Sequence, residues 1–167
     1  FDGESFWGQG YYGSLAYSGS NLYSSAAYTH TTPTFRVDNG FETRNGRREV
    51  STQTYYTFRF DSGLLRTVSP QVMLAKVWNT DGVVKDEYGY FDLSTSLRKY
   101  QISLHSQYMF STELYRGIEF RGIWNFHQCV HITPSQLVSF GGNIGYGDQI
   151  AYGWRAMGRQ TRVGAFK

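Results

Sequence analysis

The sequence has little of what a soluble protein surface is usually made of. Of its 167 residues, 17% are charged, against roughly 25% in an average soluble domain. Lysine occurs at four positions, which are Lys76, Lys85, Lys99 and Lys167. Soluble β-proteins commonly place lysine and glutamate on their wet faces and edge strands. The polar positions here are mostly Ser, Thr, Gln, Asn, Tyr and Arg, which suits a confined aqueous lumen better than bulk water.

Other absences exclude whole classes of protein. A single cysteine, Cys129, excludes an intrachain disulfide. No apolar run reaches the roughly 18 residues of a transmembrane helix, although a membrane β-strand needs no such run because it is only half apolar. The net charge of +3 includes no basic run beyond Arg44, Arg47 and Arg48, so nucleic-acid binding is not expected. No signal peptide is visible from Phe1 onward. We therefore expect either a mature product or a piece of a longer chain.

Aromatic residues and glycine are abundant, and the aromatic residues alternate with polar ones. Aromatic residues make up 18% of the chain, with 19 glycines. The alternation is strictest over residues 100–114 and 118–133, where one face carries Tyr108, Phe110, Trp124 and Phe126. A period of two predicts strands with one apolar and one polar face. These runs exceed the usual strand of about 5–6 residues and suit strands that cross a bilayer at a tilt.

The rest of the chain is typical of further hairpins. Alternating runs and turn signals predict strands over 6–18, 22–30, 49–60, 64–78 and 88–97, and then over 137–146, 150–156 and 158–167. The longest irregular stretch is residues 31–48. The expected fold is an all-β, antiparallel up-and-down meander of about eight or nine strands, forming a transmembrane β-barrel or part of a larger one. We expect residues 1–167 to be a single barrel domain.

The pattern also predicts which side chains share a face. The apolar faces, expected to meet lipid, carry Val50, Phe58, Phe91, Leu93, Phe110, Phe120, Trp124 and Phe126. The lumen-facing candidates are Gln53, Arg59, Asp92, His105, Gln107, Glu119, Arg121, Asn125 and His127, with Ser51 on the same side.

The register of the central hairpin can be predicted from its turn. A three-residue loop over residues 115–117, with Gly117 in the left-handed conformation, would place Leu114 opposite Ile118. The same register places Phe110 opposite Gly122, Tyr108 opposite Trp124, Gln107 opposite Asn125 and His105 opposite His127.

Short motifs resemble a known family. The runs Ser14-Leu15-Ala16-Tyr17, Thr34-Phe35-Arg36-Val37-Asp38-Asn39-Gly40-Phe41 with Arg44, and Asp61-Ser62-Gly63-Leu64-Leu65-Arg66 look like the C-terminal barrel region of bacterial proteins with domain of unknown function 5916. The resemblance implies a Gram-negative outer-membrane barrel, commonly preceded by a region similar to a family-nine carbohydrate-binding module. That module is absent from these residues. Apart from the resemblance, the loop over residues 31–48 is either a solvated surface loop or one that folds against the barrel and shapes an opening. The candidates for shaping an opening are Phe35, Arg36, Asp38, Phe41 and Arg44.

The sequence contains little evidence for a catalytic or metal-binding site. His127 and His131 lie roughly 13 Å apart along a strand, too far to share a metal ion. No nucleophile elbow places Ser, His and an acid together. We expect no enzyme activity, no cofactor and no metal.

Three functions fit these features. The first is an outer-membrane barrel that acts as a pore or as the membrane part of an uptake or export assembly, in contact with lipid, other envelope proteins or carbohydrate. The second is a soluble β-sandwich that binds carbohydrate. The third is a small closed barrel that serves as an adhesin or anchor.

Overall fold

The computed structural model describes residues 7–35 and 45–166, and these residues form β-structure almost throughout. One short 3-10 helix, η1 (Lys99–Gln101), interrupts the strands. The strands are β1 (Gly10–Ser18), β2 (Leu22–Thr31), β3 (Arg47–Tyr56), β4 (Phe58–Arg59), β5 (Leu65–Asn79), β6 (Val84–Leu97), β7 (Ser103–Tyr115), β8 (Ile118–Ser135), β9 (Val138–Ala151) and β10 (Ala156–Phe166).

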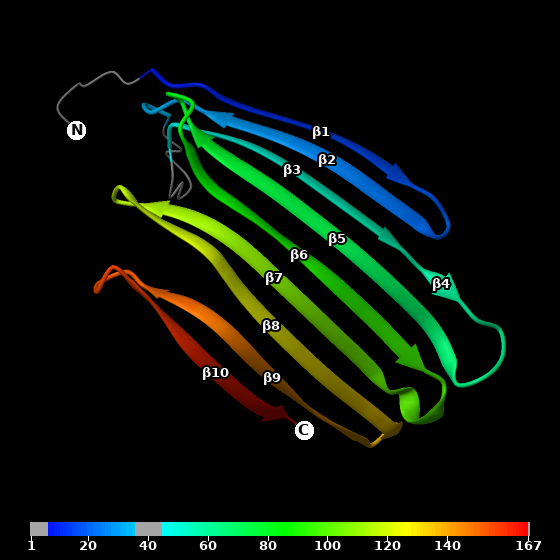
Figure 1. Ribbon diagram of the computed structural model, residues 1–167. Coiled ribbons are helices and arrows are strands. Elements are labelled where there is room, and N and C mark those ends of the chain that lie inside the picture. Colours follow the sequence, from blue (N-terminus) through cyan, green and yellow to red (C-terminus); the bar gives the residue numbers. More distant parts are fainter. Residues whose placement is uncertain (1–6, 36–44, 167) are drawn as a thin grey trace.

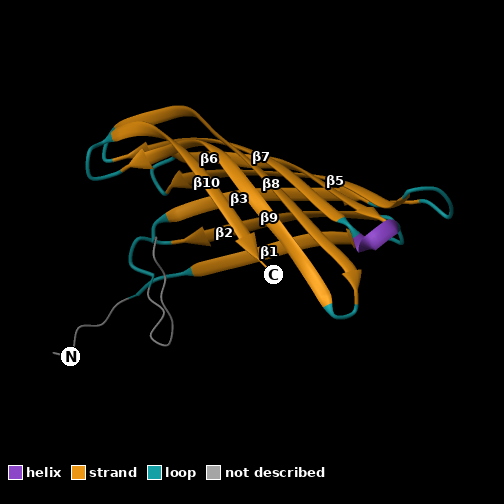
Figure 2. Ribbon diagram, turned by 90° about the horizontal axis from the view of Figure 1, so that it is seen from below, coloured by secondary structure: helices purple, strands orange, loops and turns teal. Residues whose placement is uncertain are grey.

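All ten strands belong to one antiparallel sheet in chain order, which confirms the predicted all-β meander. β4 pairs with β5 in the same register as β3 does, so β3 and β4 together occupy one place in the sheet. The sheet is curved and open, with β1 at one edge and β10 at the other (Figures 1 and 2). Within the described residues the sheet does not close, so a closed barrel is not confirmed.

The central hairpin turns more tightly than the sequence predicted. Its loop is Arg116–Gly117, with φ angles of 49° and 80°, and Tyr115 lies opposite Ile118. Two consecutive positive φ angles are typical of a type I′ turn, whose twist matches that of the flanking strands. The predicted three-residue loop is therefore wrong, because Arg116 adopts a conformation that non-glycine residues seldom take.

A β-bulge then shifts the register a second time. The pairing changes between Ser111 and Glu113 of β7, opposite the left-handed Gly122 of β8 (φ 67°). Beyond the bulge, His105 lies opposite Cys129, Gln107 opposite His127 and Phe110 opposite Trp124. The predicted pairs of this hairpin are therefore all wrong.

The bulge also exchanges the two faces at the start of β8. Phe120 lies opposite Glu113, and its side chain joins a small core with Ile123 and Ile150 instead of the apolar face of Trp124. Glu119 lies opposite Leu114, so Glu119 and its ion-pair partner Arg121 leave the polar face to which alternation assigned them. An extra residue in one strand reverses the face of every side chain before it.

Gly122 offers a test of the bulge. A Cβ atom added at Gly122 or at Gly158 would meet no heavy atom within 4 Å, but Gly122 alone of the two has a positive φ. We expect Gly122→Ala to lower the free energy of unfolding by about 1–2 kcal/mol, the cost of a left-handed L-residue, and Gly158→Ala to leave it unchanged. Urea-unfolding midpoints of the two variants measure the difference, and equal midpoints would contradict the bulge.

The C-terminal strands also differ from the prediction. β9 runs without a break from Val138 to Ala151, through the glycine-rich stretch where the predicted strand ended at residue 146. The chain turns at residues 152–155, with Arg155 at a φ of 52°. The separate strand predicted over 150–156 is therefore wrong, because β9 ends at Ala151 and β10 begins at Ala156. At the start of β7, Tyr100 belongs to η1 with a φ of 57° and not to the strand.

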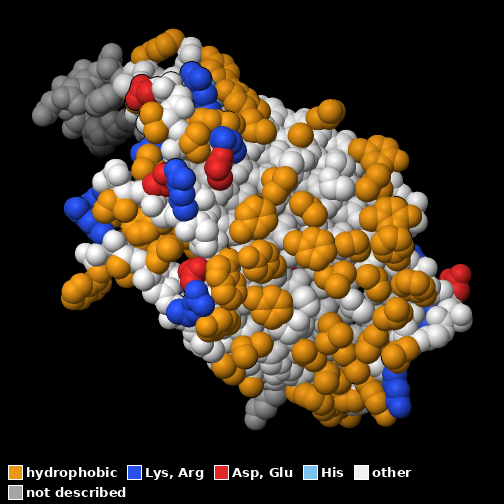
Figure 3. Space-filling view, viewed as in Figure 1, with side chains coloured by type: hydrophobic (Ala, Val, Ile, Leu, Met, Phe, Trp, Pro, Cys, Tyr) orange, Lys and Arg blue, Asp and Glu red, His pale blue; other side chains and the backbone are white. Residues whose placement is uncertain are grey.

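The strand pairings give the sheet one strongly apolar face. We call this set of side chains the apolar belt: Tyr11, Leu15, Tyr17, Leu22, Tyr28, Val50, Tyr56, Phe58, Val72, Leu74, Phe91, Leu93, Tyr108, Phe110, Trp124, Phe126, Phe140, Ile144, Tyr146 and Val163. Most belt side chains are exposed, and hydrophobic groups cover the sheet in Figure 3. Apart from Phe120, the residues predicted for an apolar face all lie in the belt. The opposite side of the sheet is the polar face described below.

Charged side chains on the belt side gather near one end of the sheet, where β1 and β10 begin (Figure 3). There, Lys76 pairs with Glu87, Arg121 with Glu119 at 2.7 Å, and Arg159 with Asp148 at 3.0 Å. On this face Lys76 lies opposite Val50 of the belt, and the Arg159 guanidinium lies over the rings of Trp124 and Tyr146. None of the helical structure in the described ranges 7–35 and 45–166 could span a membrane.

Candidate functional site on the polar face

The polar face carries most of the candidates predicted from alternation. Across β3, β6, β7 and β8, the pairings place on one side Gln53, Asp92, His105, Gln107, Asn125 and His127. Ser51 and Arg59 share this side, since they pair with Ala75 and Thr67 of β5. Whether this face lines a lumen stays a prediction, because the sheet is open.

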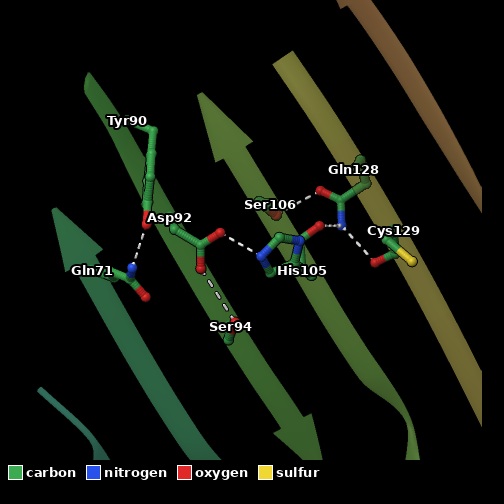
Figure 4. A network of polar contacts seen from close by, with 8 residues as sticks. All are labelled: Gln71, Tyr90, Asp92, Ser94, His105, Ser106, Gln128 and Cys129. Atoms are coloured by element: carbon green, nitrogen blue, oxygen red, sulfur yellow. Dashed lines mark hydrogen bonds and ion pairs between the residues drawn. The ribbon is translucent and has the colours of Figure 1, made fainter. Parts of the chain in front are cut away.

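The middle of the polar face holds a contact between a carboxylate and an imidazole on adjacent strands. Asp92 of β6 is 4% exposed, and its carboxylate contacts the Nε2 of His105 on β7 (Figure 4). The Ser94 hydroxyl donates to the same carboxylate at 3.3 Å. One strand further, the Gln71 amide donates to the Tyr90 hydroxyl at 2.7 Å. A buried carboxylate is costly unless it is paired in this way.

The two histidines at the centre of the polar face lie beside each other. His105 and His127 are diagonal neighbours and not directly opposed, with ring centroids 6.4 Å apart in an edge-on arrangement. In the described ranges, no group of three or more His, Cys, Asp or Glu side chains could hold a metal ion. The arrangement can donate and accept hydrogen bonds.

A hollow of about 620 Å³ lies on this face over β7 to β10. Its wall carries amides, two charged side chains and apolar groups, among them Gln107, Asn125, Asn143, Gln149, Gln160, Asp148, Arg162, Met109, Ile150 and Tyr152. Gly145 of β9 also lines the hollow and presents no side chain on the polar side. The amides, the guanidinium and the carboxylate offer hydrogen-bond donors and acceptors to polar groups.

Alternation alone did not predict this hollow, although the sequence contains a signal for it. Glycines at every second or fourth position of one strand remove side chains from one face only. The glycines of β9 differ in how closely their neighbours approach. An added Cβ at Gly141 would lie 2.3 Å from the Val130 carbonyl oxygen, whereas one at Gly145 would find its nearest atom 3.7 Å away.

The remaining candidates lie at the ends of the sheet or outside the described residues. Arg59 donates to the Ser20 carbonyl at 3.0 Å and to the side chain of Asn21, so it fastens the turn between β1 and β2. Phe35 covers Gly10 with its ring. The other loop candidates, Arg36, Asp38, Phe41 and Arg44, lie outside the described residues.

Two polar side chains on the belt side, Ser106 and Gln128, form their hydrogen bonds within the protein. The Ser106 hydroxyl donates to Gln128 Oε1 at 2.6 Å. The Gln128 amide nitrogen donates to the carbonyls of His105 and Cys129 at 3.1 and 3.2 Å (Figure 4). These two side chains therefore need no water on the apolar side.

No family model, curated protein or solved structure matches this chain.

Proposed function

We propose that this chain forms part of the wall of an outer-membrane β-barrel, with the apolar belt against lipid and the polar face toward an aqueous interior. The belt carries the proposal, because it extends over every place in the sheet and its side chains remain exposed. Soluble proteins seldom expose contiguous apolar patches beyond a few hundred Å². In a bilayer the same exposure is favourable.

The strand lengths and the polar groups support the same function. β5 to β9 contain 13 to 18 residues each, enough for the roughly 9–11 residues of a tilted membrane crossing. Side chains at Ser106 and Gln128 bond to each other and to the backbone, as hydrocarbon requires of buried polar groups. The charged side chains on this side gather toward one end of the sheet and form ion pairs there.

The polar face supports passage or holding of small polar solutes, as a pore or as the membrane part of an uptake or export assembly. Its hollow over β7 to β10 presents several neutral amides, with one carboxylate and one guanidinium of opposite charge. Amide linings hydrogen-bond neutral solutes without holding one sign of charge strongly. The link to carbohydrate use implied by the family resemblance remains a hypothesis.

The test is cysteine labelling along β7 in native membranes, in a Cys129→Ser background. Met109 and Phe110 are each 43% exposed and lie on opposite faces. We expect Met109→Cys to react with a charged maleimide, and Phe110→Cys and Tyr108→Cys to react at least about tenfold more slowly. The reagent stays in water, and apolar surroundings disfavour the reactive thiolate.

Nitroxide-labelled lipids supply the complementary measurement. A fluorophore at Phe110→Cys, attached in detergent before reconstitution, should be quenched more strongly than one at Met109→Cys. Equal labelling rates at all three positions, with a folded monomer in detergent-free buffer, would contradict the membrane function and favour the soluble carbohydrate-binding alternative.

A further inference from the structure

The two edges of the sheet run in the same direction. The strands occupy nine places in the order β1-β2-β3-β5-β6-β7-β8-β9-β10, and every neighbouring pair is antiparallel. The first and last strands of an odd antiparallel series are parallel, as the arrows of β1 and β10 in Figure 1 show. Direct pairing of β1 with β10 would therefore create a parallel seam.

The two edges carry few of the features that protect natural edge strands. β1 contains no charged residue and no proline, and β10 contains two arginines but neither lysine nor proline. Both strands pair with their inner neighbours without a bulge over nine and eleven residues. Soluble edges are usually short, charged, bulged or covered. Both edge strands are therefore suited to pair with a further strand.

The exposure of the outer side chains supports this. Leu15 on β1 and Val163 on β10 are each 79% exposed, whereas Phe110 and Val72 inside the sheet are 43% exposed on the same face. The inner side chains are less exposed because a strand lies on each side of them. An additional strand on each side would bring the edge residues to the exposure of the rest of the belt.

We infer that the working barrel contains an odd number of strands beyond those described here, inserted between β10 and β1, and that the strand beside each edge runs antiparallel to it. This inference rests on the proposed function, because open edges are not tolerated in hydrocarbon. The total is then even and is ten or more, the even number found in bacterial single-chain barrels. The inserted strands continue the belt, with apolar side chains on the side of Leu15 and Val163.

Two other ways of covering the edges make different predictions. If β1 paired with β10 of the same chain, the seam would be parallel and the barrel would have nine strands. If two copies closed a shared barrel about its axis, β10 of one copy would meet β1 of the other, again in parallel. Disulfide trapping separates these arrangements, because cross-strand cysteines bridge only when their Cβ atoms lie about 3.5–4.5 Å apart.

The experiment uses the protein as its gene encodes it, assembled in native membranes, with Cys129→Ser. Ser14→Cys or Ala16→Cys on β1 is combined with Gln160→Cys or Gly164→Cys on β10, all on the polar side of the sheet. The positive control is Ser14→Cys with Ala27→Cys, which are directly opposed. Hydrogen exchange of the β1 and β10 amides is measured on the same preparation.

We expect both edges to be protected from exchange, the control pair to form a disulfide, and none of the β1–β10 pairs to do so. A β1–β10 disulfide within one chain would overturn the inference in favour of direct closure. A disulfide between chains would overturn it in favour of a shared barrel. Rapid exchange at either edge would show that no strand covers it and would also overturn the inference. The labelling contrast between Met109→Cys and Phe110→Cys is independent of these results, so failure of the membrane function is recognised separately.

Discussion

Replacing Phe110 with arginine is expected to prevent stable insertion of the protein into the membrane. Phe110 lies in the middle of β7 within the apolar belt, and its side chain is 43% exposed. An arginine on the lipid face near the bilayer midplane costs about 2–4 kcal/mol. That loss is a large part of the stability of a typical domain, which is only about 5–15 kcal/mol. The measurement is the fraction of the protein that is protease-resistant and heat-modifiable in the outer membrane.

Met109→Arg is the matched control. Met109 has the same exposed fraction and is adjacent in the sequence, but it points to the polar face beside Asn125. We expect this variant, and Gln107→Arg, to insert as the parent protein does. Equal tolerance of arginine at Met109 and Phe110 would show that the belt does not meet lipid.

Phe110 has a second role that a further variant isolates. Its ring lies over Gly89 of β6, the residue directly opposite, where an added Cβ would lie 2.9 Å from the ring. The predicted register had assigned this cover to Gly122. Aromatic side chains commonly shield a cross-strand glycine in this way. Phe110→Leu removes the aromatic cover but stays apolar, so it should insert with a modest loss of stability.

The sequence was sufficient to predict the strands and most of their faces. Alternation with a period of two requires no tertiary information, and it placed Asp92, His105 and His127 on one side as the pairings do. The register of the central hairpin was not predictable in the same way, since it depends on the conformation of the turn between β7 and β8. Nothing in the sequence marks Arg116 as a residue with positive φ.

The bulge in β8, in contrast, has a signal in the sequence. Ile123 is an apolar residue at a position of the strand where the alternation requires a polar one, and Gly122 precedes it. An apolar residue out of phase beside a glycine is typical of a bulge. Counting strict alternation across this point placed Phe120, Glu119 and Arg121 on the wrong faces. The candidate site was predictable as a set of polar residues but not as a hollow, which depends on how β8, β9 and β10 align their glycines and amides.

The alignment of β8, β9 and β10 depends on Gly141, and Gly141→Ala is the second substitution with a large expected effect. An added Cβ would lie 2.3 Å from the Val130 carbonyl oxygen and 2.6 Å from the Phe166 ring. Val130 belongs to β8 and Phe166 to β10, so the methyl group would push both neighbours away from β9. Overpacking of this kind costs about 1–3 kcal/mol, or more where backbone must move.

Gly145→Ala provides the matched control for this variant. Gly145 lies four residues further along β9 on the same face, and its added Cβ would find the nearest atom, in the His127 ring, at 3.7 Å. We expect the urea-unfolding midpoint to fall strongly for Gly141→Ala and to change by the equivalent of about 0.5 kcal/mol or less for Gly145→Ala.

The double variant Gly141→Ala with Phe166→Ala identifies which neighbour opposes the methyl group. Removing the Phe166 ring relieves the contact with β10 but leaves the Val130 carbonyl oxygen in place. The double variant should therefore remain less stable than Phe166→Ala alone, because a backbone oxygen cannot rotate away as a side chain can. If adding Gly141→Ala to Phe166→Ala costs nothing, the close approach of β8 to β9 at this position is not what requires glycine.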